Sequence, residues 1–205
     1  MKHILFDFAR TIVEHPADSM GLSIVRATGL TDEEDISMVR NAIFSVGKYL
    51  NNLDDGSMSR DEYRKLMAAE LPERLRSYAI EAADYHMRIL PPIPGMKELL
   101  VKLRKDGYKL YILSNLDDYH TPQMQETEYV NYFDGMFFSC EVGVRKPYKE
   151  FFEEALKRFN LEAEDCLFID DLEENVEGAE ACGIRGFVFT GDAKEAERFI
   201  YSNNN

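Results

Sequence analysis

The chain of 205 residues is predicted to fold as an α/β protein, a doubly wound parallel sheet that carries an inserted all-helical segment. Two observations predict this fold class. Between residues 91 and 205, short apolar runs alternate with amphipathic stretches, as in successive parallel β-α units. Residues 14–90, in contrast, have helical periodicity and contain no convincing strand. The length of the chain suits one domain with a modest insertion.

Five short apolar runs are predicted to form the strands of the sheet. Each run is rich in aliphatic or aromatic side chains, and the first one ends on a carboxylate and a phenylalanine. Continuous apolar runs are typical of parallel strands that are buried on both faces. The predicted strands are residues 3–8, 110–113, 136–138, 166–169 and 186–189.

Amphipathic stretches between these runs predict the helices that cover the sheet. Apolar residues at helical spacing mark residues 96–103 and 151–159, and Gly107 is placed to end the first of these helices. Thr121 and Pro122 predict a third helix start, with the threonine hydroxyl as its cap and the proline in its first turn.

The insertion has its own start and stop signals. Residues 31–34 and 59–62 both fit a capping box, in which a hydroxyl and a carboxylate satisfy the first turn of a helix. Residues 51–56 between them have turn composition, and the proline-rich residues 91–94 with Gly95 end the helical pattern. The predicted division is residues 1–13 with 91–205 for the sheet layer and residues 14–90 for the helical insertion.

The composition excludes several classes of function. The chain has 24 basic and 38 acidic residues, a formal charge of −14, which opposes binding to the phosphate backbone of a nucleic acid. No apolar run approaches the roughly 20 residues that a membrane span requires, and the early Asp7 leaves no room for a secretory segment. The three scattered cysteines fit neither a zinc site nor a disulfide framework. These features predict a cytoplasmic protein that binds neither membranes nor nucleic acids.

Polar residues follow four of the predicted strands, at the edge of the sheet where ligands bind in such folds. Asp7, Ser114 with Asn115, Lys146, and the pair Asp170 and Asp171 all come at or soon after a strand end. Three neighbouring carboxylates repel one another unless a cation joins them, and hard oxygen ligands favour Mg²⁺. Lys146, Ser114 and a backbone amide are then placed to hold a phosphate group.

These residues resemble the four motifs of the haloacid dehalogenase (HAD) superfamily. The matching segments are Asp7-Phe8-Ala9-Arg10-Thr11, Leu113-Ser114-Asn115, Lys146-Pro147 and Phe168-Ile169-Asp170-Asp171. The resemblance covers essentially the whole chain and is closest to bacterial phosphatases that act on sugar phosphates such as glucose 1-phosphate. It implies a Rossmann-like core and a helical cap of the C1 type, made by residues 14–90.

The resemblance also implies a role for each motif residue. Asp7 is then the nucleophile that forms an aspartyl-phosphate, and Lys146 neutralises charge on Asp7 and on the phosphate. Ser114 and Asn115 bind the phosphate of a small phosphorylated metabolite. The implied metal site, for Mg²⁺, consists of Asp7, the backbone carbonyl of Ala9, and Asp171, with Asp170 beside them.

Two positions depart from the family pattern. The phosphatases usually carry a second aspartate where this chain has Ala9, and that aspartate protonates the leaving group and later activates water. General acid–base catalysis of this kind contributes about 10²–10⁴ in rate. Arg10 replaces the usual glycine and is a candidate contact to the phosphate or the substrate.

Other carboxylates are weaker candidates for the site. Glu14, Asp117 and Asp118 are considered as substitutes for the missing acid, and Asp54 and Asp55 in the predicted turn as substrate contacts. His120 is equally compatible with a role in the site and with a position at a helix start.

Three functions remain open from the sequence. The favoured hypothesis is a Mg²⁺-dependent phosphomonoesterase, slowed by the absence of the second aspartate. The first alternative is a binding or regulatory protein that has the fold but has lost turnover through Ala9. The second is a 2-haloacid dehalogenase, which the pair Asp170 and Asp171 disfavours because a metal-free enzyme has no use for clustered acids.

Overall fold

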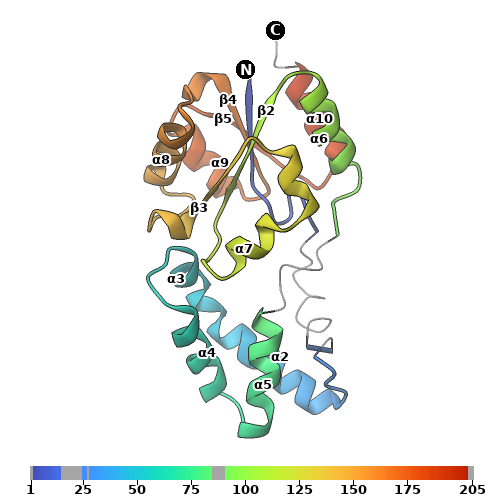
Figure 1. The fold of residues 1–205 in the computed structure, drawn as a ribbon, viewed down its shortest axis with the longest axis vertical. Helices are drawn as coiled ribbons and strands as arrows, with labels where there is room; N and C mark the ends of the chain where they lie inside the picture. The colour runs from blue at the N-terminus through green and yellow to red at the C-terminus, as the bar shows by residue number, and fades with distance from the viewer. Residues whose placement is uncertain (1, 15–24, 27, 85–90, 203–205) are drawn as a thin grey trace.

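The computed structural model describes residues 2–14, 25–26, 28–84 and 91–202. Its centre is a five-stranded sheet with strand order β3-β2-β1-β4-β5, and all four pairings are parallel (Figure 1). The α/β fold class predicted from the sequence is therefore confirmed. The strands are β1 (His3–Phe6), β2 (Lys109–Ser114), β3 (Gly135–Phe138), β4 (Cys166–Asp170) and β5 (Arg185–Val188).

The strand order places the reversal of the winding beside β1. The chain adds β2 and β3 on one side of β1, then returns to add β4 and β5 on the other. Ligands of open parallel sheets bind in the crevice at such a reversal, beyond the carboxyl ends of the strands. Phe6 is in register with Ile169, so Asp7 and Asp170 follow side by side at this position.

Helices cover both faces of the sheet, as the alternation of side chains along β1 requires. Ile4 and Phe6 belong to the core that packs on α6 (Met96–Lys105) and α10 (Ala193–Ser202). Leu5 points to the opposite face and packs with residues of α8 (Lys149–Phe159) and α9 (Glu173–Glu180) (Figure 1). The sheet is therefore buried on both sides, which explains why its central strands are continuous apolar runs.

Short helices lie in the connections between β2, β3 and β4. They are α7 (His120–Gln125), η2 (Glu128–Tyr132), η3 (Ser139–Glu141) and η4 (Ala163–Asp165). The predicted threonine cap of α7 is wrong, because the Thr121 hydroxyl donates to the Asp117 carbonyl at 2.9 Å. The cap is the side chain of Asp117, whose Oδ1 accepts from the backbone N–H groups of Tyr119 and His120, both at 2.9 Å.

The helices that follow β1 lie together beside the sheet layer (Figure 1), and they share a separate apolar core. Val39, Tyr63, Met67 and Leu75 are among its buried members. No strand occurs between residues 28 and 84, which agrees with the predicted all-helical insertion. The elements are α2 (Glu33–Val46), η1 (Gly47–Tyr49), α3 (Leu50–Asp54), α4 (Arg60–Ala69) and α5 (Glu73–Asp84).

Helix starts in the insertion follow the predicted pattern with one displacement. The capping box at α4 is confirmed: Ser59 Oγ accepts from the N–H of Glu62, and Glu62 accepts from the N–H of Ser59. At α2 the capping side chain is Asp32 and not Thr31, since Asp32 Oδ1 accepts from the N–H groups of residues 34 and 35.

The predicted turn over residues 51–56 is shorter in the structure. α3 continues to Asp54, so only the last two residues of that range lie beyond the helix. Gly56 turns the chain with a φ of 72°, a left-handed conformation that glycine adopts without steric cost.

The insertion leaves and rejoins the sheet layer at one place. The N–H of Glu14 donates to the Pro91 carbonyl at 2.8 Å, and the N–H of Ile93 donates to the Ile12 carbonyl at 3.0 Å. The two connections therefore run side by side, next to the loop that follows β1.

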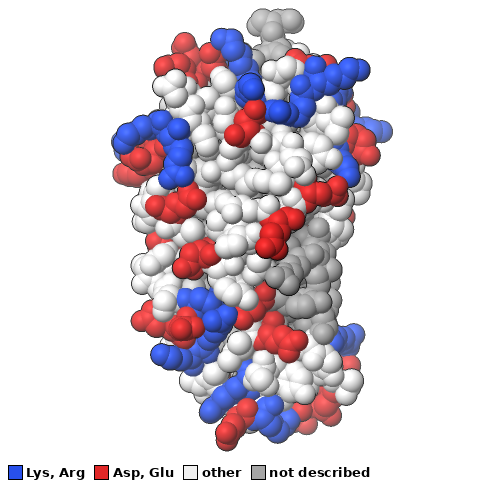
Figure 2. All heavy atoms as spheres, viewed as in Figure 1, with Lys and Arg blue, Asp and Glu red and all other residues white. Residues whose placement is uncertain are grey.

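Charged side chains are dispersed over the surface. On the face shown in Figure 2, groups of Lys and Arg are interspersed with Asp and Glu, and the described part of this face carries no continuous basic stripe. In the described part of the chain, no helix combines the length and apolar character that crossing a membrane requires.

Gly178 gives a test of how tightly α9 packs at the edge of the site. A Cβ at this position would lie 2.2 Å from the carbonyl oxygen of Pro147, the residue after Lys146. We expect Gly178→Ala to lower the free energy of unfolding by about 1–3 kcal/mol, since overpacking forces the backbone to shift. Chemical denaturation measures this, with Gly47→Ala as the matched control. A Cβ on Gly47 meets no atom within 4 Å, so equal losses in the two variants would contradict the prediction.

Candidate active site

Asp7 is the first residue beyond β1, so the predicted strand over residues 3–8 is two residues too long. The chain turns immediately afterwards, because the carbonyl of Phe8 accepts from the N–H groups of Ile12 and Val13 at 2.8 and 3.2 Å. The N–H of Asp7 donates to the carbonyl of Ile169 at 2.9 Å, which ties this residue to β4. Asp7 therefore lies at the reversal of the sheet, where the sequence predicted a nucleophile.

Lys146 joins the carboxylates at the ends of β1 and β4. Its Nζ lies 2.5 Å from Asp7 Oδ1 and 2.7 Å from Asp170 Oδ2. The side chains of Lys146 and Asp170 are 1% and 0% exposed, and that of Asp7 is 11% exposed. A buried ammonium needs such partners, since an unpaired charge in the protein interior is strongly unfavourable. Of the three groups, Asp7 is the one that retains access to solvent.

Asp170 is held by hydrogen bonds on both of its carboxylate oxygens. Asn175 Nδ2 lies 3.1 and 3.0 Å from Oδ1 and Oδ2, and the N–H of Leu172 donates to Oδ1 at 2.9 Å. With Lys146 also bound, Asp170 is a rigid anchor for the ammonium. Asn175 was not predicted as a site residue, and only its spacing from Asp170, on the first turns of α9, points to it.

Asp171 faces the loop after β1 and forms an ion pair with Arg10. The Arg10 Nε and Asp171 Oδ2 atoms are 2.9 Å apart, and the two side chains are 44% and 16% exposed. Arg10 has a φ of 60°, in the left-handed region that glycine normally occupies. The turn of the family pattern is thus kept although arginine replaces glycine, and its N–H donates to the Val13 carbonyl at 2.7 Å.

Three carboxylates form a group that fits a divalent cation. Asp7, Asp170 and Asp171 each offer an oxygen atom, and these atoms all lie within 4.8 Å of one another. Carboxylate oxygens are the donors that Mg²⁺ prefers, and their mutual repulsion falls when a cation lies between them. Ala9 lies in the same loop, and its methyl group supplies no acid to the site.

Ser114 ends β2, next to the strand that leads to Asp7, and Asn115 follows it. Ser114 is the last residue of the strand and is buried. Asn115 Nδ2 donates to the Lys146 carbonyl at 3.1 Å, and the N–H of Lys146 donates to Asn115 Oδ1 at 2.8 Å. The Asn115 side chain thus positions the backbone of Lys146 in this structure, and its direct contact to phosphate remains a prediction.

Burial sets the protonation properties of the site. It raises the pKa of Asp7 to about 7, although the nearby ammonium of Lys146 acts in the opposite direction. Burial alone lowers the pKa of Lys146, but the charges of Asp170 and Asp7 outweigh it and hold this pKa above its usual range. Burial likewise raises the pKa of Asp171, with Arg10 opposing. Without a bound cation, Asp7 and Asp171 therefore hold protons more tightly than exposed carboxylates do.

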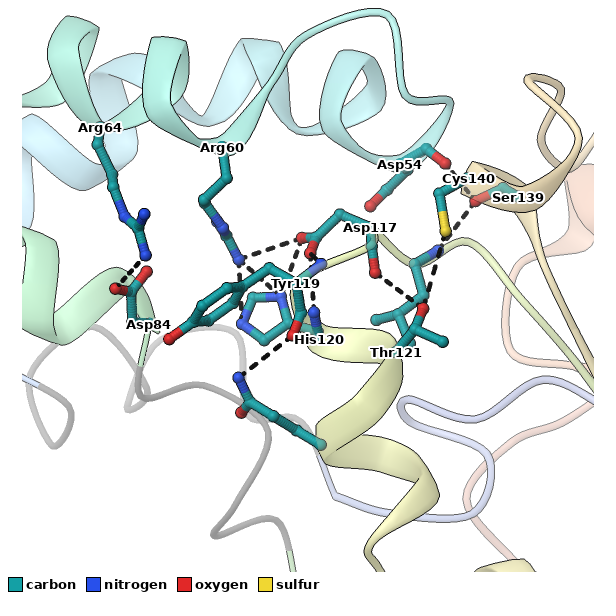
Figure 3. Close-up of polar contacts among 12 residues, drawn as sticks. Asp54, Arg60, Arg64, Asp84, Asp117, Tyr119, His120, Thr121, Ser139 and Cys140 are labelled. Atoms are coloured by element: carbon teal, nitrogen blue, oxygen red, sulfur yellow. Dashed lines mark hydrogen bonds and ion pairs between the residues drawn. The ribbon is translucent and has the colours of Figure 1, made fainter.

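A second polar cluster joins the insertion to the sheet layer (Figure 3). Arg60, the first residue of α4, places Nη2 3.1 Å from Asp117 Oδ2 and 2.7 Å from His120 Nδ1. His120 Nδ1 also lies 2.9 Å from Asp117 Oδ2, and all three side chains are buried. The guanidinium stacks on the ring of Tyr119 at 5.0 Å. Asp117 and His120 were considered from the sequence, whereas Arg60 was missed because no local pattern connects it to them.

Asp54 lies on the insertion side of the same contact (Figure 3). The Ser139 hydroxyl donates to the Asp54 carbonyl at 2.5 Å, and it accepts from the N–H of Leu116 at 2.9 Å. Burial, reinforced by the charge of Asp117, raises the pKa of Asp54 to about 7. The hydrogen bonds of Ser139 to Asp54 and Leu116 fix the end of α3 against the loop that follows Ser114.

A match to a known family agrees with this geometry. The model of the haloacid dehalogenase-like hydrolases matches residues 1–183, which include the Asp7, Ser114, Lys146 and Asp170 segments. The chain belongs to this family. Membership explains why residues from four strand ends meet at one point of the sheet, and it makes the chain a HAD-like hydrolase.

Several relatives of this HAD-like hydrolase are phosphatases. A sesquiterpene phosphatase of Aspergillus oryzae is 38% identical over 104 residues, 49% of this chain and 52% of that protein. A D-ribitol-5-phosphate phosphatase of Bacteroides thetaiotaomicron is 24% identical over 200 residues, 91% of each chain. The chain spans only about half the length of several curated relatives that it matches, the sesquiterpene phosphatase among them.

Solved structures share the whole fold of this HAD-like hydrolase. A HAD family enzyme of Bacteroides thetaiotaomicron, in complex with magnesium and inorganic phosphate, superposes with a TM-score of 0.70 at 21% identity. The match covers 96% of this chain and 98% of that one. At this identity the likeness establishes the fold, while the substrate of the present chain is a separate question.

Proposed function

We propose that this HAD-like hydrolase is a Mg²⁺-dependent phosphomonoesterase that acts on a small phosphorylated metabolite, a sugar or polyol phosphate being favoured. The observation that supports this most is the buried group of Asp7, Lys146 and Asp170, with Asp171 within reach of the same cation. The group combines a partly accessible carboxylate, a fixed ammonium and oxygen ligands at one strand-end crevice. Relatives named as phosphatases of glyceraldehyde 3-phosphate and D-ribitol 5-phosphate support the same class of substrate.

Each residue then has a defined task in the reaction. Asp7 attacks the phosphorus atom, the bond from phosphorus to the leaving oxygen breaks, and an aspartyl-phosphate forms. Lys146 stabilises negative charge on Asp7 and on the phosphate oxygens, while Ser114 hydrogen-bonds the phosphate. Water then cleaves the aspartyl-phosphate and restores Asp7. A bound Mg²⁺ lowers the repulsion between the carboxylates and the phosphate, and the ligands proposed for it are Asp7, Asp171 and the carbonyl of Ala9, with Asp170 beside them.

Specificity is assigned to the helical insertion. We propose that residues 14–90 are a cap domain on a core of residues 1–13 and 91–205. The paired connections near Glu14 and Pro91 and the separate core of the insertion support this division. A cap of this kind excludes water and selects the leaving group by shape.

Replacement of the usual acid by Ala9 predicts a preference among leaving groups. Without a proton donor at this position, esters with good leaving groups, such as aryl and glycosyl phosphates, are expected to react faster than primary alkyl phosphates. Ala9→Asp should raise the rate with alkyl phosphates by about 10²-fold or more, and the rate with aryl phosphates much less. Steady-state kinetics with matched pairs of esters measures this. Equal rates for alkyl and aryl esters in the wild type would contradict it.

A phosphatase screen tests the proposed function itself. The protein is assayed on sugar, polyol and aryl phosphates with MgCl₂ or with EDTA, beside Asp7→Asn and the exposed control Asp192→Asn. We expect Mg²⁺-dependent turnover that only Asp7→Asn abolishes, and acid-quenched wild type should carry phosphate on Asp7. The alternative, a binding or regulatory protein that lost turnover through Ala9, predicts a different result. Turnover that is absent in the wild type but present in Ala9→Asp would favour this alternative.

A further inference from the structure

Arg10 occupies an unusual position next to the proposed metal ligands. It lies three residues after Asp7, and its Nε is 2.9 Å from Asp171 Oδ2. Asp171 is at the same time one of the three carboxylates whose oxygens lie within 4.8 Å of one another. Asp171 is therefore bound by one cation of the chain, the Arg10 guanidinium, and is also a proposed ligand of Mg²⁺ from solution.

These two cations oppose each other. An oxygen that accepts a guanidinium N–H has less electron density to offer a metal, and two positive charges this close repel. Asp170 cannot replace Asp171 as the partner of Arg10, because its oxygens already bind Lys146, Asn175 and a backbone N–H. Binding of a divalent cation at Asp171 therefore competes with the Arg10 contact.

The loop allows the guanidinium to move while its backbone stays in place. The N–H of Arg10 is bound to the Val13 carbonyl, whereas its side chain is 44% exposed. The left-handed backbone at this residue also means that glycine can replace arginine without strain. Arg10 can thus be removed without loss of the turn.

We propose that Arg10 is a counter-cation that occupies Asp171 in the metal-free protein and is released to the phosphate of the substrate when Mg²⁺ binds. This inference rests on the proposed function, and it adds a regulation of metal affinity by a residue of the chain. In the metal-free site, Arg10 then offsets part of the negative charge of the three carboxylates and holds Asp171 in place. In the loaded site, the same guanidinium adds positive charge where the phosphate lies.

Two affinities with opposite responses test the proposal. Isothermal titration of EDTA-stripped protein with MgCl₂ is expected to show about 3- to 10-fold tighter binding for Arg10→Gly, as loss of a partly exposed ion pair allows. Titration with inorganic phosphate at saturating Mg²⁺ should show weaker binding by a similar factor. Arg10→Lys, which keeps the charge, should lie close to the wild type in both titrations.

Controls separate this exchange from a general effect of charge. Arg158→Ala removes one positive charge from an exposed pair with Glu141 and should leave the Mg²⁺ affinity unchanged. In nitrogen NMR, the Nε–H signal of Arg10, identified by its loss in Arg10→Lys, should lose protection from solvent exchange when Mg²⁺ is added. Unchanged or weaker Mg²⁺ binding in Arg10→Gly would overturn the proposal. Neither titration needs turnover, so its failure is distinct from failure of the phosphatase screen.

Discussion

Replacement of Lys146 by Met is expected to abolish turnover and to lower the free energy of unfolding by about 3–5 kcal/mol at pH 8. The ammonium lies 2.5 and 2.7 Å from Asp7 and Asp170, and both it and Asp170 are fully buried. Its removal leaves two neighbouring carboxylates without a counter-charge, and it is their desolvation that destabilises the variant. Turnover is lost because the same ammonium stabilises charge on the nucleophile and on the phosphate.

This loss is expected to depend on pH in a defined direction. Burial raises the pKa of Asp7 from 3.8 to about 7 in the metal-free protein, so the folded state holds this proton more tightly than the unfolded chain. The contribution of Asp7 to stability is therefore present below pH 4 and is lost as the pH rises towards 7. Without Lys146 to lower it, the pKa of Asp7 rises further, so the deficit of the variant is smallest near pH 5 and largest near pH 8.

Urea denaturation in EDTA at pH 5 and pH 8 measures the loss of unfolding free energy and its dependence on pH. Lys149→Met is the matched control, because its ammonium is 60% exposed and pairs with Glu153 on the surface of α8. Such a pair contributes at most about 1 kcal/mol, so this variant should remain close to the wild type at both pH values. A Lys146→Met protein as stable at pH 8 as at pH 5 would show that Asp7 and Asp170 are not the groups that destabilise it.

The strands and the residues that follow them could be predicted because each depends on local pattern. Buried parallel strands such as β4 are apolar up to the polar residue that ends them, and the fold brings their carboxyl ends together whatever the loops do. The position of Asp7, Lys146 and Asp170 in one site therefore follows from the order of strands and helices. The exact helix starts do not, because Thr31 and Asp32 are both good caps and only packing of α2 selects between them.

Partners that are distant along the chain could not be predicted. Asn115 binds the backbone of Lys146 across 31 residues of the chain. This contact leaves no periodic or compositional signal. The contact of Arg60 could not be predicted either. In the sequence, Arg60 is indistinguishable from a solvent-exposed helix residue, and only the packing of α4 against the loop after β2 buries it.

Arg60 attaches the insertion to the sheet layer through a buried contact with Asp117. Its side chain is 8% exposed and that of Asp117 is 7% exposed, in a contact that spans 57 residues of the chain. Burial alone would raise the pKa of Asp117, but the bond with His120 and the charge of Arg60 hold this pKa below its usual value. The carboxylate is therefore stabilised in its charged form by groups from both layers of the molecule.

Arg60→Met is expected to lower the free energy of unfolding by about 3–5 kcal/mol at pH 7, because it leaves Asp117 charged and buried. The loss should shrink below pH 4, where the carboxylate binds a proton in the variant and in the unfolded chain. Arg26→Met, from an exposed pair with Glu33, is the matched control and should change stability by less than about 1 kcal/mol.

A double-mutant cycle with Asp117→Asn identifies the source of the effect. If the penalty of Arg60→Met comes from the unpaired carboxylate, then Asp117→Asn removes most of it, with a coupling free energy of about 2 kcal/mol. Additive losses would instead assign the effect to lost stacking on Tyr119. Hydrogen exchange adds a local measurement: Arg60→Met should speed exchange in α3 and α4, which lie beside the contact, while β1 and β4 keep their protection. Such a pattern would mean that one buried guanidinium holds the insertion against the crevice where Asp7 lies.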